Sequence, residues 1–121
     1  MQDQKHITTA TTVLRLGLAV VFLWFGFSQL FDGVSWVYWV PEWAVSLFHL
    51  PPAMIVLANG IFEVVAGALL AMNVWVRPIA FVLAVHFAII TVDIGPDAVG
   101  VRDFGLTLAT LALALLNKKA P

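Results

Sequence analysis

The 121-residue chain has no cysteine. Disulfide bonds, thiol redox chemistry, thiolate metal sites and iron–sulfur clusters are therefore excluded for this chain acting alone, because all of them depend on cysteine sulfur. A haem held between helices is not favoured either. It usually takes axial ligands such as histidine from facing helices, and His86 is the only one of the three histidines that lies within a long apolar stretch.

Charged residues are scarce as well. They make up 11% of the chain, whereas hydrophobic residues make up 62%, and the mean hydropathy is +1.00. A water-soluble domain of this size would have too little interior to bury so much apolar surface. The composition therefore predicts a protein embedded in a lipid bilayer, and no nucleic-acid partner is expected.

The sequence also lacks the ten-residue alternation of apolar and polar residues that is typical of a transmembrane barrel. It has instead four apolar windows of about 20 residues, the length that an α-helix needs to cross a hydrocarbon core. They are residues 12–30, 53–72, 76–94 and 98–116. Because the connections are short, neighbouring helices should be antiparallel. The predicted fold is all-α, a transmembrane antiparallel four-helix bundle that forms a single domain over residues 1–121.

Basic residues are distributed unequally between the two faces of this bundle. The face that holds both chain ends and the connection between the second and third helices carries Lys5, Arg15, Arg77, Lys118 and Lys119. The opposite face carries only Arg102, together with several acids. Because basic residues near helix ends are retained in the cytoplasm, the pattern predicts a multi-pass protein of the inner (plasma) membrane with both termini cytoplasmic. Arg15 is expected to snorkel to the headgroups at this end.

The longest connection, residues 31–52, is rich in aromatic side chains: Trp36, Tyr38, Trp39, Trp43 and Phe48. Such rings concentrate at the headgroup level, so this aromatic segment should lie along the outer membrane surface and be partly helical after Pro41. Two interpretations are open. The rings either anchor the segment to the surface or cover a lateral opening for a lipid-like molecule.

A carboxyl group stands at the centre of the second apolar window. At this depth Glu63 costs a few kcal/mol unless it is paired, protonated or facing a polar cavity. Counting about 1.5 Å per helical residue places His86 of the third helix at the same depth. Glu63 and His86 are the predicted catalytic residues, because they can share one proton. The alternative is that they hydrogen-bond across helices and only hold the bundle together.

Five further polar residues should converge on the outer half of the bundle and bind a cofactor or ligand in a cleft open to the outside: Asn59, Arg102, Asp103, Asp93 and Gln29. Asn59 lies one turn from Glu63 on the same face. Arg102 and Asp103 could form a solvated cap at a helix start. The preferred alternative turns Arg102 inward, to neutralise Glu63 or Asp93 or to hold an anionic or carbonyl-bearing ligand. No metal site is assigned, since the spacing of these residues does not require one.

Several short motifs, each present once, follow one another along the chain. They are Arg15-Leu16-Gly17 with Gly26 and Leu30, Glu63 followed by Gly67, Arg77 with Ala80, His86, and Arg102-Asp103-Phe104-Gly105-Leu106. This order and spacing over residues 12–116 resemble the DoxX family of small four-helix membrane proteins. The sequence departs from the family pattern at Gln29, where many relatives carry lysine, so no role that needs a cation is expected there.

The resemblance implies a membrane subunit tied to respiratory or sulfur redox chemistry, as in the DoxD and DoxA type thiosulfate:quinone oxidoreductase. Carried over by position, the functional residues would be Glu63, His86, Arg102 and Asp103. The expected function is an accessory or quinone-binding component of a membrane redox complex, catalytic only as part of that oxidoreductase. No intrinsic cofactor is expected beyond a quinone. The expected partners are the bilayer and either a homo-oligomer or a larger membrane complex. A non-catalytic scaffold or assembly subunit and a small transporter remain alternatives.

Overall fold

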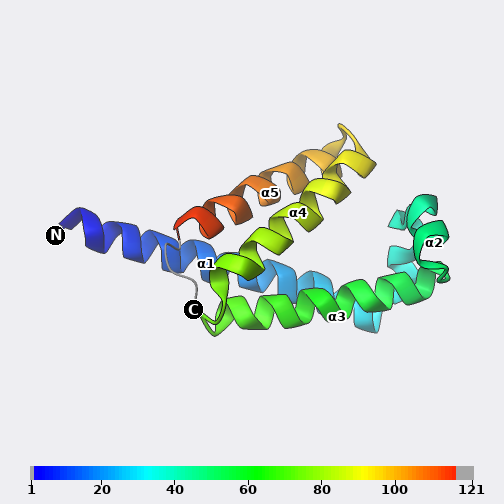
Figure 1. The fold of residues 1–121 in the computed structure, drawn as a ribbon, viewed down its shortest axis with the longest axis horizontal. Helices are drawn as coiled ribbons and strands as arrows, with labels where there is room; N and C mark the ends of the chain where they lie inside the picture. Colours follow the sequence, from blue (N-terminus) through cyan, green and yellow to red (C-terminus); the bar gives the residue numbers. More distant parts are fainter. Residues whose placement is uncertain (1, 117–121) are drawn as a thin grey trace.

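The computed structural model describes residues 2–116, and every regular element within them is helical. The elements are α1 (Gln2–Phe31), the 3-10 helix η1 (Gly33–Trp39), α2 (Glu42–Phe48), α3 (Pro52–Ala71), α4 (Val76–Ile94) and α5 (Ala98–Leu116). Among these residues, α1, α3, α4 and α5 are long and apolar enough to cross a membrane. The predicted all-α four-helix fold is confirmed (Figure 1). Lys118 and Lys119 lie outside the described residues.

The first helix is longer than predicted, because it begins at Gln2 and not near residue 12. A hydropathy window finds only the apolar part of a helix, whereas polar side chains need not interrupt the backbone ladder. The hydroxyl groups of Thr8, Thr11 and Thr12 each donate to the carbonyl four residues earlier, over 3.0, 2.7 and 3.0 Å. These bonds satisfy the hydroxyls inside the helix. The N-terminal part of α1 consequently projects beyond the bundle (Figure 1).

The connections between the spanning helices are tight, and each has a local cause. Pro52 opens α3, where its missing N–H removes no helical hydrogen bond. Asn73 and Trp75 turn the chain between α3 and α4 with positive φ angles of 60° and 52°. Gly95 ends α4 at φ 87° and ψ −168°, a conformation that is nearly restricted to glycine. Asp97 Oδ1 then accepts a 2.8 Å hydrogen bond from the Gly100 N–H and caps α5.

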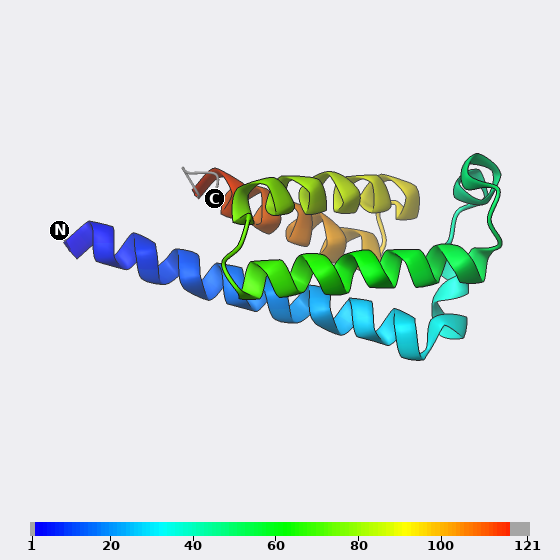
Figure 2. The same ribbon diagram turned by 60° about the horizontal axis from the view of Figure 1, so that its bottom comes forward.

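The four long helices associate as two pairs. α1 packs along α3 and α4 packs along α5, while the two pairs share much less contact (Figures 1 and 2). Near the chain ends the pairs are joined by fully buried side chains: Phe22, Leu70, Leu83 and Leu113. Toward α2 the pairs diverge (Figure 1). The two helix pairs are therefore well packed at the end of the bundle where α1 begins and α5 ends, and they separate at the opposite end.

Arg15, which was expected to snorkel to the headgroups, has protein partners that the sequence analysis did not predict. Its Nη1 donates to the carbonyl oxygens of Leu70 and Ala71, over 2.7 and 3.0 Å. The last carbonyls of a helix lack intrahelical partners and carry partial negative charge, so a guanidinium from the neighbouring helix is a suitable partner. Arg15 therefore ties α1 to the C-terminus of α3.

Replacing Arg15 with methionine should lower the free energy of unfolding by about 1.5 kcal/mol, because two charge-assisted hydrogen bonds are lost. Arg15→Lys is the matched control. Its ammonium keeps the charge and can reach one carbonyl, so it should recover part of the loss. Unfolding in mixed detergent–SDS micelles measures both. Equal stability of the wild type and Arg15→Met would show that the two contacts contribute nothing.

Candidate functional site

A cavity of about 720 Å³ lies between the two helix pairs where they diverge, beneath the aromatic segment. Most of its wall is apolar, with side chains from α3, α4, η1 and α2. All seven polar residues predicted from the sequence line it: Gln29, Asn59, Glu63, His86, Asp93, Arg102 and Asp103. The structure thus brings the whole predicted set to one cavity, which the buried side chains near the chain ends close on one side.

Glu63 is the most deeply buried acid at this cavity, with 1% of its surface exposed. Its Oε2 accepts a 3.3 Å hydrogen bond from Gln29 Nε2, and its Oε1 accepts a 3.1 Å bond from Asn59 Nδ2. Asn59 Nδ2 also donates to Gln29 Oε1 over 2.7 Å, which closes a small cycle between α1 and α3. Two neutral amides therefore hold the carboxyl group of Glu63 in place.

His86 approaches the same carboxyl group from α4. Its Nε2 lies 3.7 Å from Glu63 Oε1, which is too long for a hydrogen bond. This nitrogen is buried and has no hydrogen-bond partner among residues 2–116. The ring is held between Phe62 and Phe87, with centroid distances of 5.1 and 5.8 Å. A buried polar atom without a partner is unfavourable, so the site lacks one hydrogen-bonding group at this point.

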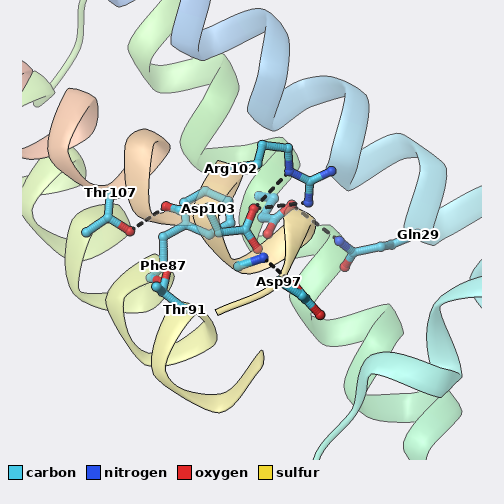
Figure 3. Close-up of polar contacts among 9 residues, drawn as sticks. Gln29, Phe87, Thr91, Asp97, Arg102, Asp103 and Thr107 are labelled. Carbon is cyan, nitrogen blue, oxygen red and sulfur yellow. Dashed lines mark hydrogen bonds and ion pairs between the residues drawn. The ribbon is translucent and has the colours of Figure 1, made fainter. Parts of the chain in front are cut away.

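Arg102 and Asp103 lie on α5 across the cavity from Gln29 (Figure 3). The Nε and Nη2 atoms of Arg102 donate to Asp103 Oδ1 over 3.1 and 3.0 Å. The guanidinium carbon also lies 5.2 Å from the centre of the Phe25 ring, within cation–π range. Arg102 therefore faces the cavity but neutralises Asp103, and not Glu63 or Asp93 as the preferred interpretation held. Nor is the pair a helix cap, because Asp97 has that role.

Asp93 lies at the outer rim of the cavity, where it meets the aromatic segment. Its Oδ1 accepts a 3.2 Å hydrogen bond from Trp43 Nε1. A second tryptophan, Trp36, donates to Ser28 Oγ over 2.9 Å and packs edge-on against Phe25. The segment is thus tied at one point to α4 and at another to α1. Four of its five rings line the cavity, those of Trp36, Trp39, Trp43 and Phe48, whereas Tyr38 is exposed.

A comparison with known protein families agrees with the fold and the residue pattern. Residues 10–95 match the model of the DoxX family. The chain belongs to the DoxX family. The matched region contains the five site residues on α1, α3 and α4, whereas Arg102 and Asp103 lie beyond it. Neither the curated proteins nor the solved structures include a significant match to the sequence.

Two apolar residues at the site of this DoxX family member were missed by the sequence analysis. Phe25 supports Arg102, and Phe62 packs edge-on against His86. A signal for both was available. Phe25 lies one turn before Gln29 on the same helical face, and Phe62 directly precedes Glu63. The sequence analysis assigned no role to either ring, because it followed only the polar residues within the apolar stretches.

The DoxX site combines a carboxyl group and an imidazole at its floor with a largely apolar wall. The carboxyl group can hold or release a proton, and the imidazole nitrogen is free to hydrogen-bond to whatever enters. Arg102 and Asn59 add N–H donors at the sides. Among residues 2–116, no group of three or more histidine or acidic side chains is placed to hold a metal ion. The geometry suits a mainly apolar molecule with one or two hydrogen-bonding oxygens.

Proposed function

We propose that this DoxX family protein is an accessory, quinone-binding subunit of a membrane redox complex of the respiratory or sulfur-oxidation type. One observation carries the proposal. Seven polar residues from four helices meet in one cavity of about 720 Å³ whose remaining wall is apolar. A quinone ring has the matching chemistry, since it is flat, apolar and carries carbonyl oxygens at its edge. The cavity volume falls within the range typical of small-molecule sites.

The chain's own residues would bind and protonate such a ring. The buried His86 Nε2 has no partner and would hydrogen-bond to a carbonyl oxygen above the floor. Glu63, oriented by Gln29 and Asn59, would pass a proton toward that oxygen, directly or through His86. The N–H groups of Arg102 would polarise the carbonyl on the other side. A bound quinone supplies two-electron, two-proton chemistry, and the electrons come from a partner subunit.

The same proposal includes the place of the protein in the cell. Lys5, Arg15 and Arg77 lie at the end of the bundle that holds the chain ends, whereas the cavity end carries mostly acids. The positive-inside rule then favours the inner (plasma) membrane with both termini in the cytoplasm and the cavity in the outer half. The broad apolar exterior fits docking against a second copy or a larger complex.

The test is the quinone content of the protein purified in mild detergent from quinone-containing membranes. The wild type should retain extractable quinone. Glu63→Gln and His86→Leu should each lower its occupancy roughly tenfold, the factor that corresponds to about 1.4 kcal/mol, a typical value for a hydrogen bond to a charged or polar group. Thr110→Val is the control, since this buried hydroxyl lies on α5 outside the cavity. A wild-type extract that contains lipid only would contradict the proposal.

A scaffold or assembly role is the second candidate, and one observation favours it. The hydrogen bonds among Gln29, Asn59 and Glu63 join α1 to α3 and would fix helix packing without any ligand. In that case Glu63→Gln would weaken the bundle or its complex and leave the extracted lipids unchanged. Identification of the proteins that co-purify with each variant distinguishes the two roles.

A further inference from the structure

A second hollow, of about 500 Å³, lies on the outer face of α4. It is lined by Trp43, Val85, Ala88, Ile89, Val92 and Asp93. The four residues from positions 85, 88, 89 and 92 follow the helical spacing that places side chains on one face. Ala88 is the small residue of this stripe, between larger neighbours. The stripe is therefore a shallow apolar groove along α4, which we call the α4 groove.

The α4 groove adjoins the main cavity. Trp43, Val85, Ile89 and Asp93 line both hollows. The hydrogen bond between Trp43 Nε1 and Asp93 Oδ1 marks the boundary between them. A molecule that extends from the main cavity past the Trp43 ring would therefore reach the outer face of α4.

The chemistry of the two hollows differs. The main cavity has the carboxyl group of Glu63 and the unpartnered His86 nitrogen at its floor. The α4 groove has a nearly wholly apolar lining, and its large side chains are well exposed, with Val92 at 84%. In a membrane-spanning helix these side chains face acyl chains. A polar head in one hollow and an apolar tail in the other would match both linings.

We infer that the site takes a long-tailed membrane amphiphile, with the head in the main cavity above Glu63 and His86 and the tail in the α4 groove beside Trp43. The inference rests on the proposed function. It extends that function from the ring of the ligand to its tail, and it adds the route by which the ligand reaches the site. The ligand enters sideways from the bilayer past Trp43 of α2 and the exposed face of α4, because the groove on that face opens to the lipid-facing side. A tail in a fitted groove gains van der Waals contacts that it would lack among mobile lipid chains.

The test compares two quinones with the same ring, one with a long isoprenoid tail and one without a tail, bound to the purified full-length protein. Ala88→Phe fills the α4 groove without altering the main cavity, which Ala88 does not line. It should weaken binding of the long-tailed quinone roughly fourfold, the effect of losing about one buried methylene group, and leave the tail-less one unchanged. Val92→Trp covers the same groove from an exposed position and should act alike. Ala112→Phe, on the exposed face of α5, is the control.

The possible results separate the two proposals. If the wild type binds neither quinone, the proposed function itself fails. Suppose instead that the wild type binds both quinones, and that Ala88→Phe and Val92→Trp bind the long-tailed one as well as the wild type does. Then only the assignment of the tail to the α4 groove is overturned, and the groove is filled by bilayer lipids. Equal weakening of both quinones would also overturn it, since the substitution would then act on the ring and not on the tail.

Discussion

Gly26→Ala is expected to lower the free energy of unfolding by about 2–3 kcal/mol, the upper part of the range for overpacked sites. A Cβ atom at Gly26 would lie 2.8 Å from the backbone nitrogen of Val64 and 2.9 Å from the carbonyl oxygen of Gly60. Both are backbone atoms of α3, so no side-chain rotation can relieve the contact. α1 and α3 would have to move apart along the interface where they pack most closely.

The matched control is Gly17→Ala on the same helix. A Cβ atom there meets nothing within 4 Å. Alanine is the better helix former, so this variant should be as stable as the wild type or more stable by up to about 1 kcal/mol. Unfolding in mixed detergent–SDS micelles compares the two. If both variants changed stability alike, helix propensity and not the close approach would explain the effect.

The close approach at Gly26 also positions the site. Gln29 is three residues further along α1, on nearly the same face, and its Cβ lies 3.1 Å from the position that a Cβ at Gly60 would take. The short separation of the two backbones lets the short amide side chains of Gln29 and Asn59 meet at 2.7 Å. Gly26→Ala should therefore disturb the polar cycle around Glu63 as well as the packing.

The sequence predicted the helices well because hydropathy and chain breakers are local signals. The helices at 76–94 and 98–116 are observed with these bounds, and the helix predicted at 53–72 is observed one residue earlier as α3 (Pro52–Ala71). Only the first helix was misjudged, since a polar helical extension has no hydropathy signal. The depth of Glu63 and His86 could also be counted along the helices, and the two residues do meet.

Side-chain partners could not be predicted in the same way, because they depend on which helices pair. The sequence does not say that α1 lies along α3, so Arg15 was assigned to the headgroups although two carbonyls of α3 are within its reach. Arg102 was expected to neutralise Glu63 or Asp93 or to hold an anionic or carbonyl-bearing ligand. It pairs instead with its neighbour Asp103, which is buried with 3% of its surface exposed. The α4 groove depends on the position of Trp43 on α2, and the sequence does not reveal how this short helix packs against α4.

The double variant Gln29→Leu/Asn59→Leu should lower the free energy of unfolding by about 3 kcal/mol, because it leaves a buried acid without its donors. Both amides bond to Glu63, whose remaining polar neighbour is His86 at 3.7 Å. Adding Glu63→Leu should restore most of this stability, since a wholly apolar cluster leaves no buried polar group without a hydrogen-bond partner. The same unfolding assay measures the wild type, the double variant and the triple variant.

The triple variant separates stability from function. If the Glu63 cluster serves only to join α1 and α3, a protein that regains its stability should also regain every property of the wild type. If Glu63 serves a ligand, the triple variant should fold and yet carry no quinone. A triple variant as unstable as the double would contradict the argument, because the leucine side chains and not the stranded carboxyl group would then cause the loss. A triple variant that is nearly as stable as the wild type would show that packing alone does not require an acid at position 63, and a ligand-binding role gives a physical reason for its presence.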